Sequence, residues 1–96
     1  MFMSDTTQDE SFWERADEII NLANKQAEDA ESDDVSSSLL YATARFNAFL
    51  VASSAEKADD IKAGKDAAVE YFTEQYRQLL IDNIDEYIEN FDEYNA

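Results

Sequence analysis

The side chains that could do chemistry in this chain are almost all carboxylates. Its 96 residues include 23 aspartates and glutamates and 7 lysines and arginines, with no histidine and no cysteine. Catalytic triads, cysteine nucleophiles, histidine-ligated zinc and the Glu-x-x-His pairs of di-iron bundles all need residue types that are missing here. A single glycine also excludes a glycine-rich phosphate loop. The sequence therefore assigns no catalytic residue and favours a function other than catalysis.

The carboxylates fall mainly off the apolar faces of the expected helices, a position typical of a solvated surface. Asp29, Glu31 and Asp33 have the spacing of the first three ligands of a calcium loop. The later positions do not fit, because Asp34 stands where the loop needs glycine and Leu40 where it needs glutamate. The sequence therefore predicts no metal ion and no cofactor.

Four polar residues beside apolar surfaces are the candidate binding residues. Arg45 follows Tyr41 by one helical turn, so its guanidinium can stack on the ring. Asn47 points toward the expected core, where its amide needs hydrogen-bond partners, and Asn24 is a weaker fourth member. One hypothesis is a site for a small anion around Arg45 and Asn47.

The alternative interpretation of these polar groups is structural. Arg45 would form an ion pair with Asp17 on the first helix or Glu74 on the third, and Asn47 would fix the register between helices. The residues alone leave both interpretations open.

Composition favours an all-helical fold. The chain is 45% hydrophobic and has no proline, so residues on which β-hairpins depend are scarce. Helical spacing of apolar residues predicts helices over 11–28, over 36–53 and from about 56 onward. Ser11 and the segment 53–56 have the spacing of capping boxes before the first and third helices.

The third helix changes its apolar side along its length. Past Leu80 the apolar stripe moves about a quarter turn around the helix axis. We therefore expect a three-helix bundle whose long C-terminal helix is bent or broken near Asp82, with a possible fourth helical segment. Residues 1–10 are predicted to form a disordered N-terminal tail, and residues 11–94 a single helical-bundle domain.

Net charge and hydropathy limit the partners. The formal charge of −16 opposes binding to nucleic acid and to anionic membranes. No apolar run reaches the roughly 18 residues of a transmembrane helix, and residues 1–8 lack the features of a secretory signal. The expected compartment is the cytoplasm.

The stretch 36–54 is unusual because Arg45 is its single charged residue. Such a helix needs cover on most sides, yet its Tyr41, Ala48 and Ala52 side has no obvious neighbour in the sequence. The first functional prediction is a protein-interaction module that binds an unknown protein partner. The same prediction includes self-association, as a homodimer. The alternatives are the small-anion or enzymatic site at Arg45 and Asn47, and an acidic mimic of nucleic acid.

Three blocks of sequence resemble a family of small proteobacterial proteins catalogued as a domain of unknown function. The first block is residues 12–17 with 22–24, the second is 38–49, and the third is 71–77 with 87–92. The likeness extends over about residues 11–94. It implies an all-helical bacterial cytosolic protein, and it carries no activity, cofactor or catalytic residue with it.

Overall fold

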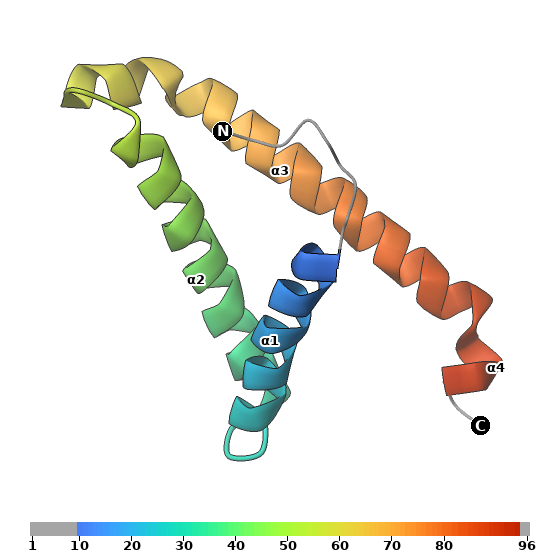
Figure 1. Cartoon of the computed structure of the whole chain (residues 1–96). Coiled ribbons are helices and arrows are strands. Elements are labelled where there is room, and N and C mark those ends of the chain that lie inside the picture. Colours follow the sequence, from blue (N-terminus) through green and yellow to red (C-terminus); the bar gives the residue numbers. More distant parts are fainter. Residues whose placement is uncertain (1–9, 95–96) are drawn as a thin grey trace. The chain divides into compact units, whose positions relative to one another are not determined.

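A computed structural model describes residues 10–94, which form helices and contain no strand (Figure 1). The helices are α1 (Glu10–Gln26), α2 (Ser32–Ser53), α3 (Ala58–Glu89) and α4 (Phe91–Tyr94). The predicted all-α class is confirmed, and so is a fourth helical segment. The tail predicted over residues 1–10 lies outside the described residues except for Glu10, the first residue of α1.

The chain divides into two compact units, Met1–Arg45 and Phe46–Ala96. The boundary falls inside α2, which is itself one unbroken helix. The first unit contains α1 and the start of α2, and the second contains the end of α2, α3 and α4. The prediction of a single domain over 11–94 stays a prediction.

The turn between α1 and α2 is shorter than the sequence suggested. The carbonyl of Glu31 accepts hydrogen bonds from the amides of Asp34 and Val35, at 3.0 and 3.1 Å. Helix α2 therefore begins at Ser32, four residues before the predicted start at 36. Asp33 and Asp34 lie in its first turn, where negative charge stabilises the amino end of a helix.

The serines at the end of α2 do not cap the next helix. The hydroxyls of Ser53 and Ser54 donate instead to the carbonyls of Leu50 and Val51, each at 3.0 Å. The capping box predicted over 53–56 is therefore wrong, because both hydroxyls are engaged by the preceding helix.

Asp60 supplies the N-terminal cap of α3. Its Oδ2 accepts hydrogen bonds from the backbone amides of Glu56 and Lys57, at 3.2 and 3.3 Å. Lys57 itself has an extended backbone, with φ −153° and ψ 165°. A carboxylate in the first turn thus satisfies amides that precede the helix, and α3 begins at Ala58.

Helix α3 continues through Asp82 and ends at Glu89, so the predicted break near Asp82 is misplaced. Side chains support the helix there: Gln78 Nε2 donates to Asp82 Oδ1 at 3.0 Å, and Asn83 Nδ2 donates to the carbonyl of Leu79 at 2.8 Å. The interruption comes at Asn90, whose backbone leaves helical geometry at φ −112° and ψ 25° before α4. At 1.5 Å per residue, the 32 residues of α3 extend over about 48 Å.

The single glycine of the chain, Gly64, lies inside α3. A Cβ added at Gly64 would meet no atom within 4 Å. Replacing Gly64 with alanine should therefore stabilise the protein by about 1 kcal/mol, because glycine loses more backbone entropy in a helix. Scanning calorimetry should record a Tm higher by about 4–8 °C. A lower Tm would contradict the open surroundings of Gly64.

Candidate functional site

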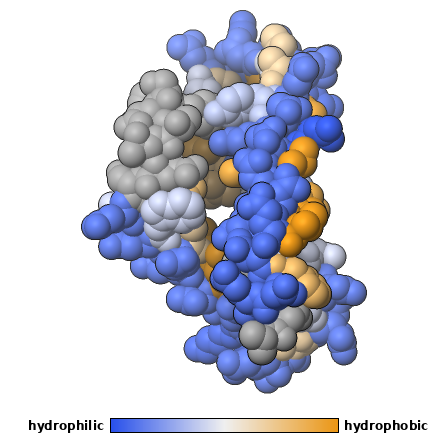
Figure 2. Space-filling view, turned by 90° about the vertical axis from the view of Figure 1, so that its right-hand side faces the viewer, coloured by the Kyte–Doolittle hydropathy of each residue, from blue (hydrophilic) through white to orange (hydrophobic). Residues whose placement is uncertain are grey.

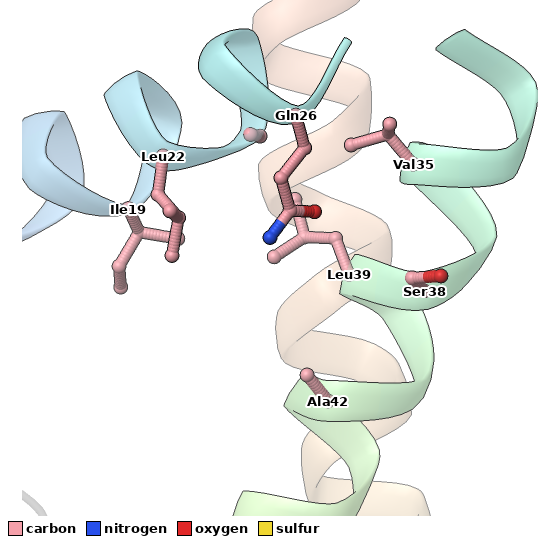
Figure 3. A pocket seen from close by; sticks show the side chains of 8 residues that line it. Ile19, Leu22, Gln26, Val35, Ser38, Leu39 and Ala42 are labelled. Atoms are coloured by element: carbon pink, nitrogen blue, oxygen red, sulfur yellow. The ribbon is translucent and has the colours of Figure 1, made fainter. Parts of the chain in front are cut away.

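The first unit contains a hollow of about 220 Å³ between α1 and α2 (Figure 3). Side chains of both helices point into it. It is lined by Ile19, Leu22, Ala23 and Gln26 of α1 and by Val35, Ser38, Leu39 and Ala42 of α2. In each helix the four lining residues are spaced by three, one and three positions, which places them on one side of the helix.

The hollow is apolar and contains no ionisable lining residue. Its polar groups are the amide of Gln26 and the hydroxyl of Ser38, both neutral. Val35 is the one buried hydrophobic residue in the described part of the chain, with 8% of its surface exposed. The hollow can accept an apolar group, and its lining residues include no acid or base that could activate the Ser38 hydroxyl as a nucleophile.

The sequence interpretation missed the buried residue of this hollow, Val35. It placed Val35 in a loop because the preceding residues are strongly acidic. The signal that would have found it is the spacing of Val35, Leu39 and Ala42, which continues the apolar side of α2 by one turn toward its amino end.

The structure places the four predicted site residues outside the hollow. Tyr41, Arg45 and Asn24 are exposed, and Asn47 is half-buried. At about 100° per residue, Tyr41 and Arg45 share one side of α2, whereas Asn47 lies about 160° from Arg45 around the helix. The helix therefore brings Tyr41 and Arg45 together and separates them from Asn47.

The alternative role of Arg45 was an ion pair. Within the first unit, the described residues include no salt bridge between Arg45 and Asp17. Glu74, the other predicted carboxylate, belongs to the second unit. The binding roles of Arg45, Tyr41, Asn47 and Asn24 remain predictions.

Large apolar side chains are exposed along α2. Leu40, Tyr41, Phe46 and Phe49 each expose more than half of their surface. The rings of Phe46 and Phe49 lie 6.3 Å apart, centroid to centroid. The helix that carries least charge is thus rich in uncovered apolar surface.

Helix α3, in the second unit, also exposes large apolar side chains. No described residue of α3 is buried, and apolar side chains are exposed along its length. Examples are Val69, Tyr76, Leu79 and Ile84. Figure 2 shows such apolar surface in orange among hydrophilic groups in blue.

Two further properties concern residues 10–94 alone. No helix in this part of the chain has an apolar stretch long enough to cross a membrane. Within the same residues, no group of three or more acidic side chains is arranged to hold a metal ion.

Two aromatic residues, Phe12 and Trp13, lie in the first turn of α1. The rings of Phe12 and Trp13 meet edge to face, with centroids 4.9 Å apart. Trp13 exposes 53% of its surface, and neither residue lines the hollow.

Comparison with known proteins gives a family match and a structural match. Residues 12–88 match the family described as "Protein of unknown function (DUF3144)". The NMR structure of the protein NB7890A from Shewanella sp. is 38% identical, with a TM-score of 0.76, over 92% of this chain and 94% of that one. No curated protein matches. The resemblance inferred from three sequence blocks is confirmed.

Proposed function

The chain belongs to the DUF3144 family, whose description assigns no function, and we propose that it acts as a protein-interaction module that self-associates. The proposal places this association in the cytoplasm, the compartment expected from the sequence. It rests on the surface of the helices, since no residue that lines the hollow is ionisable.

One observation supports the proposal most directly: α2 and α3 expose large apolar side chains, while Val35 is the one buried hydrophobic residue among residues 10–94. Each unit contains about half of the 96 residues. Units of that size rarely bury enough apolar surface to be stable alone, and without cysteine no disulfide can compensate.

A second copy of the chain can cover the apolar side chains that α2 and α3 expose. Isolated helices gain most of their stability from packing an apolar side against a neighbour. A homodimer provides the same apolar surfaces twice, related by a twofold axis. Association would then remove from water the side chains that each unit exposes, at about 25 cal/mol for each Å² of apolar surface.

Sedimentation equilibrium over micromolar to millimolar concentrations tests the proposal. The average mass should rise from monomer toward dimer with concentration. Each copy has a formal charge of −16, so repulsion between copies should weaken association at low salt. The Debye length falls from about 30 Å at 0.01 M salt to about 8 Å at 0.15 M, and the apparent Kd should fall at least about tenfold over that range. A single monomeric species at both salts, up to millimolar protein, would refute self-association.

A further inference from the structure

The hollow between α1 and α2 leaves much of its apolar lining uncovered. Ile19, Leu22 and Leu39 line it and expose 53%, 56% and 37% of their surface. Val35 is the exception, with 8% exposed. An occupant that covers the three exposed side chains would remove apolar surface from water, which favours a complex.

The shape of the hollow suits a helix. The lining residues extend over about two turns of each helix, and they lie on one side of α1 and one side of α2 (Figure 3). Grooves of this kind accept the apolar side of an amphipathic helix, whose side chains repeat every three or four residues. An apolar cavity of about 150 Å³ holds a benzene molecule. The hollow of about 220 Å³ can therefore hold one leucine or phenylalanine side chain of such a helix.

The residues around the hollow are acidic, although those that line it are neutral. Among residues 10–45, nine are acidic and three are basic. Glu18 directly precedes Ile19, and Asp34 directly precedes Val35. At about 100° per residue, each of these two carboxylates lies about 90° from the centre of the lining residues of its own helix. A carboxylate therefore borders the hollow on each of the two helices.

This charge determines the sign of the occupant. A basic helix would be attracted to the acidic border, whereas an acidic helix would be repelled. Each helix among residues 10–94 contains more acidic than basic residues, so a helix from a second copy is disfavoured in the hollow. The occupant that fits both the apolar lining and the charge is a basic helix from a different protein.

We propose that the hollow between α1 and α2 binds a basic amphipathic helix of a partner protein. A leucine or phenylalanine of that helix enters the hollow beside Leu22 and Leu39, and its lysines or arginines lie near Glu18 and Asp34. This interaction goes beyond the proposed self-association, because its occupant is a different protein and no second copy of the chain is needed.

A synthetic peptide is a defined probe for this proposal. It contains about 18 residues of leucine and lysine with the leucines on one side, a length at which an isolated helix forms. Fluorescence anisotropy of the labelled peptide, at protein concentrations below those that give dimers, should show a Kd below about 100 µM at about 0.15 M salt. One control peptide has glutamate in place of lysine, and another has the same composition in scrambled order. Both should bind at least about tenfold more weakly.

Substitutions at two leucines locate the binding site. Leu22 and Leu40 have nearly the same exposure, 56% and 57%, but only Leu22 lines the hollow. Leu22→Asn should weaken binding of the basic peptide at least about fivefold, because the apolar contact with the peptide is lost. Leu40 lies about 150° from the centre of the lining residues of α2, so Leu40→Asn should change the Kd by less than about twofold. Circular dichroism verifies that both variants remain helical.

Neutral substitutions of the bordering acids test the charge. Glu18→Gln combined with Asp34→Asn should weaken binding about fivefold at about 0.15 M salt. The control combines Asp17→Asn with Asp33→Asn, at positions about 170° from the centre of the lining residues of each helix. Asp33 and Asp34 both lie in the first turn of α2, so their loss affects that helix end alike. The control should change the Kd by less than about twofold, because a helix about 10–12 Å across is wider than the Debye length of about 8 Å.

Salt dependence separates this interaction from self-association. Raising the salt from about 0.01 to about 0.15 M should weaken binding of the basic peptide at least about tenfold, whereas the same change should strengthen self-association. Equal affinity for the basic peptide and either control peptide, or equal losses from Leu22→Asn and Leu40→Asn, would overturn the proposal. So would an absence of binding up to about 1 mM protein, which would indicate that another part of the chain or a second copy occupies the hollow. Sedimentation equilibrium without the peptide measures self-association independently of these results.

Discussion

Replacing Val35 with aspartate is expected to abolish the packing of α1 against α2. Val35 is the one buried hydrophobic residue in the described part of the chain, and the other residues that line the hollow are mainly apolar and none is ionisable. An unpaired carboxylate in such a place costs several kcal/mol, a large part of the roughly 5–15 kcal/mol that stabilises a whole domain. Thermal unfolding followed by far-UV circular dichroism should show loss of the cooperative transition.

A smaller change at the same position should give a graded result. Val35→Ala should reduce stability by about 2 kcal/mol, from lost burial and the space left behind, and lower the Tm by about 8–16 °C. Leu40→Asp is the control on the same helix, because Leu40 exposes 57% of its surface and should change monomer stability by less than about 0.5 kcal/mol. If Val35→Asp unfolded like the wild type, the hollow could not be the packed interior of the first unit.

Replacing Leu79 with aspartate is expected to weaken self-association at least about tenfold. Leu79 is one of the apolar residues that α3 exposes, and a twofold interface contains each side chain twice. Full burial of an exposed leucine contributes about 1.5–3 kcal/mol. Because Leu79 has 44% of its surface left to bury, two copies account for about 1.3–2.6 kcal/mol, which corresponds to a change in Kd of roughly tenfold or more. The added charge would increase the loss further. Sedimentation equilibrium should find the variant monomeric at concentrations where the wild type dimerises.

Ile81 provides the control for this prediction. It exposes 38% of its surface, close to the 44% of Leu79, and it lies about 160° away around α3. Ile81→Asp adds the same charge on the other side of the helix and should change the Kd by less than about threefold. Equal losses for the two variants would indicate that the added charge, and not the side of α3 on which it lies, controls association.

The helical content of this protein was predictable from its sequence, but the ends of its helices were not. The chain has no proline and one glycine, so the residues on which β-turns depend are scarce. The helical spacing of apolar residues identified each long helix. Helix ends depend on which of several polar side chains captures the free amides. Near α3, serines and acidic residues competed, and Asp60 took the role that the sequence interpretation gave to the segment 53–56.

The misplaced break near Asp82 shows that a change of apolar side does not mark the end of a helix. Leu80, Ile84 and Ile88 lie about a quarter turn from the earlier apolar residues of α3, yet the helix continues to Glu89. The side chains of Gln78 and Asn83 form hydrogen bonds along this part of the helix. The shift is therefore a property of one continuous helix.

The candidate binding residues were predictable only in part. Spacing placed Tyr41 and Arg45 together, because four residues make about one turn. The same rule separates Arg45 from Asn47, which the hypothesis of a shared anion site had joined. Composition gave no sign of the hollow, since its lining depends on how α1 and α2 converge after a turn whose acidic residues resemble a loop.

The edge-to-face pair at the start of α1 has a spectroscopic consequence. Trp13 is the single tryptophan of the chain, and it lies in the first turn of α1, at the opposite end from the turn that leads to α2. Its emission therefore reports on fraying at that terminus, where local opening needs least free energy. Trp13 fluorescence would follow the start of α1, whereas circular dichroism would follow all the helices. A difference between the two midpoints of thermal unfolding would therefore measure how independently α1 opens.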